Sequence, residues 1–299
     1  MRSDGLLLAL FFLVGLIGQR FVSDLLRRGL WLTYFSTVAP VLVFATFLTA
    51  SFDRPLLLAI AAVITATWLV GAVGYTYAVL VARTRAERGA LALGASFGNN
   101  GFLGLPLAQL FFGHAGLSLA VVYGRLAWLV PDTSISTAIA RLHGGPVRAS
   151  RPLLAMLLNP PLIALGVALT LRAAGVAPPV ESAESLAAAA VGPAGFLLLG
   201  LSLPLDPPVH SPAEVKRAAG ALTIRLAGGP AMLWLVGSAL GADIPGVFYL
   251  LAGMPCAFHL LVLARVYGLR PSLMRLLVVG STIPAVIVAG IGLGLARWL

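Results

Sequence analysis

The sequence predicts an all-α membrane protein with ten transmembrane helices, arranged as two inverted five-helix repeats whose fourth and ninth helices are broken and cross. Three observations lead to this prediction. Of the 299 residues, 60% are apolar and only 10% are charged, whereas soluble domains carry about 25% charged residues. Loops rich in Lys and Arg alternate along the chain with loops that carry few of them. Glycine and proline interrupt the fourth and ninth apolar stretches near their middles.

Each predicted span is an apolar stretch close to the roughly 20 residues that cross a bilayer as a helix. The separators are short and rich in proline, glycine and charge, as in the Asp53-Arg54-Pro55 turn. Asp4 interrupts the first stretch and no cleavage site follows, so we interpret it as a span and not as a signal peptide. The spans are expected at residues 5–22, 30–50, 55–82, 89–112, 115–140, 152–172, 184–203, 216–240, 246–266 and 273–297.

The basic residues predict how these spans are oriented. Fourteen of the 20 Lys and Arg residues follow odd-numbered spans, and four lie on the opposite side. Because positive loops stay in the cytoplasm, both termini are expected outside, in a multi-pass protein of the plasma (inner) membrane. The net charge of +10 is therefore interpreted as a topology signal. The expected partners are the lipid bilayer and a small anion, with no nucleic acid.

The chain divides after the fifth span into two sets of five spans. The first repeat is expected at residues 1–143, a cytoplasmic linker at 144–151 and the second repeat at 152–299. Because five is odd, the second repeat enters the membrane in the opposite orientation, as in transporters built from inverted repeats. One weak internal similarity between the halves is a proline inside span four, Pro106, and another inside span nine, Pro255.

Span four contains the segment that a continuous helix tolerates least. Its three glycines, one proline and two adjacent amides are Gly98, Gly101, Gly104, Pro106, Asn99 and Asn100. Each glycine costs a helix about 1 kcal/mol and an interior proline about 3 kcal/mol relative to alanine. We interpret the segment as a broken helix lining a substrate site. Close helix packing through the glycines is the alternative, although it does not account for the amides.

Span nine carries a similar interruption at Gly253 and Pro255. Proline is favoured at the first position of a helix, so Pro106 and Pro255 are expected to begin second half-helices. Their N-terminal ends would face each other and attract a small carboxylate. The candidate substrate-binding residues are Ser96, Asn99, Asn100, Gly101, Arg125, Pro255 and His259. The expected crossover residues are Gly98, Gly104, Pro106, Gly253 and Pro255.

Two arginines and one histidine lie inside spans. Arg125 is expected at the substrate site and Arg225 as a supporting charge, because intramembrane arginines usually face a pathway. Tethering to backbone carbonyls, or snorkelling, is the alternative for both. His259 can accept a proton, and a hydrogen-bonded core histidine is the alternative. Asp132 lies about 10 Å along the helix from Arg125, too far for a direct ion pair, and is expected near the cytoplasmic end.

The sequence gives no sign of an enzyme or of a cofactor site. Cys256 is the single cysteine, which excludes an internal disulfide and a thiolate metal cluster. No H-E-x-x-H or G-x-S-x-G motif occurs. We therefore expect no enzymatic activity and no cofactor, while coupling to a proton or to a sodium ion is left open.

Three segments resemble the auxin efflux carrier family, and in particular its bacterial malate- and malonate-permease-like branch. They are Gly98–Leu107 in span four, Asn159-Pro160-Pro161-Leu162 before span six and Met254-Pro255-Cys256-Ala257 in span nine. The resemblance implies a scaffold of spans one, two, six and seven and a mobile transport unit of spans three to five and eight to ten. It implies that Asn99 or Asn100 faces a carboxylate, and a homodimer through the scaffold is a further expectation. In this chain, residues 65–80 lack the charges found there in plant members.

These observations predict a secondary transporter of small organic anions, carboxylates such as auxin-like or dicarboxylic acids, that works by alternating access. A sodium-coupled carrier of the bile-acid type is the nearest alternative. A membrane sensor or structural protein without flux is the alternative from another class. The sequence leaves the substrate, the direction of transport, the coupling ion and the oligomeric state open.

Overall fold

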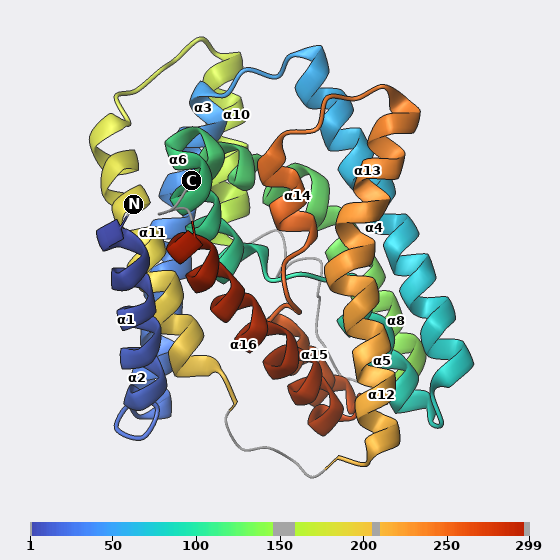
Figure 1. Ribbon diagram of the computed structural model, residues 1–299. Helices are drawn as coiled ribbons and strands as arrows, with labels where there is room; N and C mark the ends of the chain where they lie inside the picture. Colours follow the sequence, from blue (N-terminus) through green and yellow to red (C-terminus); the bar gives the residue numbers. More distant parts are fainter. Residues whose placement is uncertain (1, 146–158, 205–209, 296–299) are drawn as a thin grey trace. The chain divides into compact units, whose positions relative to one another are not determined.

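The computed structural model describes residues 2–145, 159–204 and 210–295 (Figure 1). Every named element in these residues is a helix, so the predicted all-α class is confirmed. Six helical segments are long and apolar enough to span a membrane, and Gly5–Gly18 and Pro160–Ala173 are shorter apolar helices. The six are Asp24–Thr49, Arg54–Val81, Asn100–Ala127, Glu181–Ser202, Pro212–Leu240 and Pro271–Ala289. The protein is therefore multi-pass, and the count of ten spans stays a prediction.

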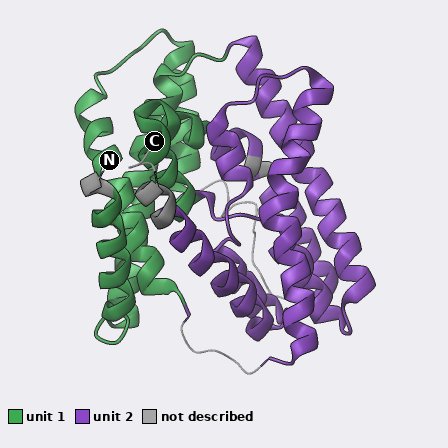
Figure 2. Cartoon of the chain, in the orientation of Figure 1, with its two compact units in different colours: residues 1–52, 101–122, 148–203 green, residues 53–100, 123–147, 204–299 purple. Residues whose placement is uncertain are grey.

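The chain forms two compact units, each assembled from both halves of the sequence (Figure 2). Unit 1 consists of Met1–Phe52, Gly101–Val122 and Arg148–Leu203. Unit 2 consists of Asp53–Asn100, Tyr123–Val147 and Pro204–Leu299. The predicted repeats, scaffold and transport unit stay predictions, and most of the predicted linker at 144–151 lies outside the described residues.

In unit 1, the first helix packs against a helix from the second half of the chain at very short range. The helices of unit 1 are α1 (Arg2–Gly18), α2 (Asp24–Ser36), α3 (Val38–Thr49), α6 (Leu105–Val122), α10 (Pro160–Ala173) and α11 (Glu181–Ser202). A Cβ atom added to Gly15 of α1 would lie 2.3 Å from the carbonyl oxygen of Leu197, and one added to Gly200 of α11 would lie 2.2 Å from that of Phe12. Only glycine on both helices permits this backbone approach.

Aromatic side chains fill another part of unit 1. Trp31, Tyr34 and Phe35 of α2 surround Phe102, with ring centroids 4.2 to 5.6 Å from that of Phe102. The indole of Trp31 also donates to the hydroxyl of Ser202 at 2.8 Å. The cluster therefore joins α2 both to the chain that leads into α6 and to the end of α11.

Helix α6 is two helical stretches joined by a turn. Gly113 has φ +66° and ψ −159°, a backbone conformation that costs glycine little and other residues much. This turn falls between residues 112 and 115, where the sequence predicts the end of span four and the start of span five.

Unit 2 begins with the long helix α4 (Arg54–Val81), followed by α5 (Arg85–Ser96). Its central part contains η2 (Tyr123–Trp128), α7 (Leu129–Pro131), η3 (Asp132–Ser136) and α8 (Thr137–His143). Its remaining helices are α12 (Pro212–Thr223), η4 (Ile224–Gly228), α13 (Gly229–Leu240), α14 (Gly246–Ala252), α15 (His259–Tyr267) and α16 (Pro271–Leu295). Asp53, Thr84 and Ser211 cap α4, α5 and α12 by accepting a backbone N–H bond, which satisfies a donor that the helix cannot.

A buried cluster of charges joins three helical segments at one end of unit 2. The fully buried carboxylate of Glu87 accepts from the Nε of Arg217 at 2.6 Å and from the backbone N–H of Arg83 at 3.0 Å. Arg270, which precedes α16, lies 3.9 Å from Glu87 and pairs with Glu214 of α12. The cluster fixes the starts of α5, α12 and α16 together.

Candidate functional site

Two helices of unit 2 end within apolar stretches of the sequence, and a non-helical segment follows each of them. Helix α5 ends at Ser96, and residues 97–99 separate it from the π-helix η1 (Asn100–Gly104). Helix α14 ends at Ala252, and residues 253–258 separate it from α15. The breaks do not coincide with the starts expected from proline. Pro106 is the second residue of α6, and Pro255 precedes α15 by four residues.

The two interruptions pair with each other, and we call residues 97–99 and 253–258 the crossing. The backbone N–H of Asn99 donates to the carbonyl of Pro255 at 2.6 Å, and that of Ala257 donates to Phe97 at 3.1 Å. Gly98 and Cys256 face each other as an isolated antiparallel bridge. The paired strands satisfy backbone groups that would otherwise be costly to bury.

Side-chain hydrogen bonds also connect the bridge to the neighbouring helices α16 and α5. The backbone N–H of Cys256 donates to the hydroxyl of Ser281 in α16 at 3.0 Å, and the Cys256 thiol donates to the carbonyl of Gly94 at 3.1 Å. A Cβ atom on Gly98 would lie 3.1 Å from the carbonyl oxygen of Met254. Gly98 therefore allows the close approach of the second segment.

Arg225 binds the ends of both broken helices. Its Nη1 donates to the carbonyl of Ser96, the last residue of α5, at 2.6 Å, and its Nη2 donates to Ala252, the last residue of α14. Its Nε donates to Met254 at 3.1 Å. Arg225 is only 5% exposed. The tether to backbone carbonyls, which the sequence left open for Arg225, is the arrangement found.

This geometry makes the part of the crossing at Arg225 electronegative, whereas the sequence predicted an electropositive centre. The sequence predicted that N-terminal ends of half-helices meet at the centre. The ends that converge on Arg225 are C-terminal, and a helix C-terminus carries about half a negative charge. A cation is therefore the complementary group at this point, and Arg225 supplies it.

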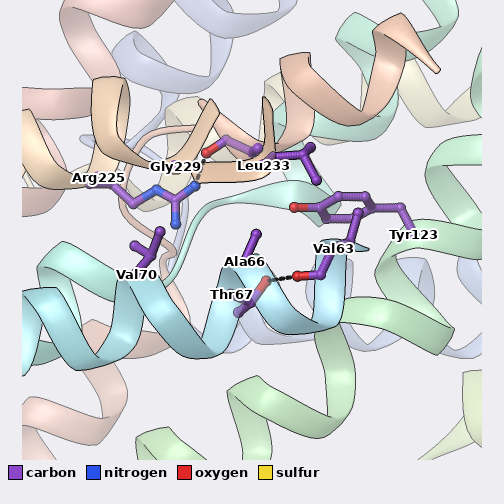
Figure 3. A pocket seen from close by; sticks show the side chains of 9 residues that line it. Val63, Ala66, Thr67, Val70, Tyr123, Arg225, Gly229 and Leu233 are labelled. Carbon is purple, nitrogen blue, oxygen red and sulfur yellow. Dashed lines mark hydrogen bonds between the residues drawn. The ribbon is translucent and has the colours of Figure 1, made fainter. Parts of the chain in front are cut away.

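A small pocket lies beside Arg225 within unit 2 (Figure 3). Arg225 lies at one end and Tyr123 at the other, with the Tyr123 hydroxyl pointing into the space between them. The enclosed part has room for about one water molecule. The lining residues are Val63, Ala66, Thr67, Val70, Tyr123, Arg225, Gly229, Leu233 and Ala252. Sequence reasoning missed Tyr123 and Thr67, although a hydroxyl within an apolar span is a detectable signal.

Asp132 and His259 form a second polar contact in unit 2. The Nε2 of His259 lies 3.1 Å from the Oδ1 of Asp132. The side chain of His259 is 39% exposed and that of Asp132 is 10% exposed. His259 is therefore hydrogen-bonded but not enclosed, and an imidazole–carboxylate pair of this kind can take up or release a proton.

The structure brings together some of the predicted site residues and not others. At the crossing lie Ser96, Gly98, Asn99, Asn100, Gly253, Pro255 and Arg225, with both amides buried. Gly101, Gly104 and Pro106 belong to unit 1, where Pro106 packs on Gly195 of α11. Arg125 lies in η2 and does not line the pocket.

Gly229 offers a test of the packing at Arg225. A Cβ atom at Gly229 would lie 2.3 Å from the carbonyl oxygen of Ala252 and 3.1 Å from the Nη2 of Arg225. Gly229→Ala is therefore expected to lower the free energy of unfolding by about 1–2 kcal/mol through overpacking. Thermal unfolding of the purified protein in detergent measures the loss.

The adjacent Gly228 provides the matched control. It is also helical, and its added Cβ would meet only Ile224, at 3.7 Å. Gly228→Ala is expected to be neutral or slightly stabilising, because alanine favours a helix over glycine. Equal effects of the two substitutions would contradict the close approach at Gly229.

A comparison with known protein families finds a match in the second half of the chain. Residues 149–291 match the model of a family described as "Membrane transport protein". No curated protein matches the chain. The matched residues contain Arg225 and residues 253–258 of the crossing.

Proposed function

Because residues 149–291 belong to the auxin efflux carrier family of membrane transport proteins, we propose that this protein is a secondary transporter of small organic anions. It works by alternating access, with the cargo near the crossing. The cargo class is a carboxylate, either an auxin-like monocarboxylate or a dicarboxylic acid such as malate or malonate. The protein lies in the plasma (inner) membrane with both termini outside.

The observation that carries the proposal is the pairing of two interrupted helices at Gly98 and Cys256. Non-helical backbone at membrane depth is tolerated only where protein buries it or where it lines a cavity. Secondary transporters place their substrates at such discontinuous helices. A scaffold or sensor protein has no need of this costly arrangement.

The spacing of corresponding elements supports the proposed pair of repeats. Corresponding features in the two halves differ by 158 in residue number. The pairs are Asp53 and Ser211, which cap α4 and α12, and Gly98 and Cys256, which form the bridge.

The hydrogen bonds of the crossing follow the same shift. The bond from Asn99 to Pro255 becomes the bond from Ala257 to Phe97 when the two halves are exchanged. Arg225 likewise binds Ser96 and Met254, which are also 158 apart. A local two-fold relation at the crossing is what two inverted repeats would produce.

An anion can find donors around the pocket. A guanidinium has five N–H donors, and Arg225 commits three of them to carbonyls. The others, together with the hydroxyl of Tyr123, are available to a carboxylate that enters the pocket. Since the pocket now has room for about one water molecule, this conformation must widen to admit cargo. We take it to be one closed state of the transport cycle.

Flux of labelled carboxylates into proteoliposomes tests the proposal. Auxin-like monocarboxylates and small dicarboxylates, presented in turn, should include at least one that accumulates inside and competes with its own unlabelled form. A thermal-shift screen of the same acids should show the same preference, because ligands of the native state raise apparent stability. Ligand binding without flux would favour the sensor, and flux only in sodium would favour the sodium-coupled carrier.

Asn100→Ala is expected to lower this flux at least tenfold while the protein remains folded. The buried amide of Asn100 lies at the edge of the crossing, and losing a donor to a charged group costs about 1.5–3 kcal/mol. Gln109→Ala, which removes an amide from α6 outside the crossing, is the control. Full uptake by a correctly inserted Asn100→Ala protein would remove Asn100 from the site.

A further inference from the structure

The crossing is built as a cation site, and its cation is part of the chain. Two helix C-termini converge there, and three backbone carbonyls, those of Ser96, Ala252 and Met254, accept hydrogen bonds from one guanidinium. Within the described residues Arg225 forms no ion pair with a carboxylate. Its charge is therefore balanced by the backbone.

The charges nearly cancel. Each helix C-terminus contributes about half a negative charge, so two of them match one guanidinium. The planar fork of arginine reaches several carbonyls at once, which the compact ammonium of lysine does not. The near-complete burial of Arg225 strengthens these interactions, because little water screens them.

Half-helix C-termini and unwound carbonyls are the groups that coordinate sodium or protons in other secondary transporters. We propose that Arg225 is a permanent counter-cation that occupies this position, so that the crossing takes up no inorganic cation. Besides the donors that it offers to the cargo, Arg225 thus holds the two half-helices together. For the transport cycle, which rests on the function proposed above, cargo movement is independent of sodium.

The first experiment removes the guanidinium of Arg225 by mutation and then supplies free guanidinium ions in solution. Arg225→Ala should lower the Tm of the purified protein by on the order of 10 °C, because three buried acceptors lose their donors. Millimolar guanidinium chloride, well below denaturing concentrations, should recover a substantial part of this loss, whereas choline chloride at the same concentration should not. No difference between guanidinium and choline, or an unchanged Tm, would overturn the proposal.

Arg172→Ala is the matched control for rescue. Arg172 also donates to carbonyls at a helix C-terminus, those of Phe47 and Ala50 at the end of α3. Its contacts are only partly buried or exposed, so its removal leaves no enclosed site. Guanidinium should give Arg172→Ala no more protection than choline, and equal rescue of both variants would show that the effect is not specific to the crossing.

The wild-type protein provides a test that does not depend on any variant folding. Its Tm should be the same in sodium chloride and choline chloride at equal ionic strength, and a selective increase in sodium would overturn the proposal. Arg225→Lys, which keeps the charge but not the fork, should have a Tm between those of wild type and Arg225→Ala. These readouts are stabilities, so a failure to find carboxylate flux would refute the proposed function and leave this inference standing.

Discussion

Replacing Glu87 with alanine is expected to lower the free energy of unfolding by about 3–5 kcal/mol, because the change leaves buried positive charge without its partner. Glu87 is fully buried and binds Arg217 at 2.6 Å, with Arg270 3.9 Å away. Its carboxylate also accepts the backbone N–H of Arg83, so the substitution breaks a capping contact at the start of α5. Thermal unfolding in detergent measures the effect.

Two other substitutions make this prediction specific. Glu181→Ala removes an exposed glutamate from the first turn of α11 and is expected to change stability by no more than about 0.5 kcal/mol. Combining Glu87→Ala with Arg217→Met removes both partners, and the double variant should be more stable than Glu87→Ala alone. If Glu87→Ala behaved like Glu181→Ala, the charge cluster would not hold the helices together.

The sequence could predict the class of fold and the existence of the interruptions because both depend on local signals. An apolar stretch of sufficient length needs no knowledge of its neighbours to be recognised. The glycines near Asn99 and the Gly253–Pro255 segment likewise weaken a helix by themselves. The structure places Gly98, Asn99, Gly253 and Pro255 of these segments at the crossing.

The residue at which each helix breaks depends on hydrogen-bond partners that lie far away in the sequence. Proline is favoured at the first position of a helix, and on that basis the half-helices were expected to start at Pro106 and Pro255. The structure places the non-helical residues where Asn99 and Ala257 exchange bonds with the opposite segment. Tertiary pairing therefore decides where the helix stops, and Pro106 is accommodated within the first turn of α6.

The two arginines within apolar spans show that site residues, too, cannot be distinguished from local sequence alone. Arg125 and Arg225 have similar sequence surroundings, each an isolated charge within an apolar span. Arg225 binds the ends of α5 and α14 and lines the pocket, whereas Arg125 lies in η2 and is not among the lining residues. Its partners come from 27 to 129 positions away in the sequence, and no property of span eight alone specifies them.

Gly200→Ala is expected to cost about 3 kcal/mol, at the upper end of the range for overpacking. The added Cβ would lie 2.2 Å from the carbonyl oxygen of Phe12 and 2.8 Å from the backbone nitrogen of Leu16. Both are backbone atoms of α1, so no side-chain rotation can relieve the contact and the two helices must separate. Separation would also strain the bonds from Gln19 to the carbonyls of Gly200 and Leu203, at 2.6 and 2.8 Å. Thermal unfolding in detergent again provides the measurement.

Gly29→Ala in α2 is the control for Gly200→Ala, since a Cβ atom at Gly29 meets nothing within 4 Å. Because alanine favours a helix over glycine by about 1 kcal/mol, this substitution is expected to be neutral or stabilising. Opposite signs for the two changes would mean that contact between α1 and α11, and not helix propensity, selects glycine at position 200. The same sign and size for both would mean that α1 and α11 do not approach as closely as the structure describes, and that the first helix is free to move apart from the second half of the chain.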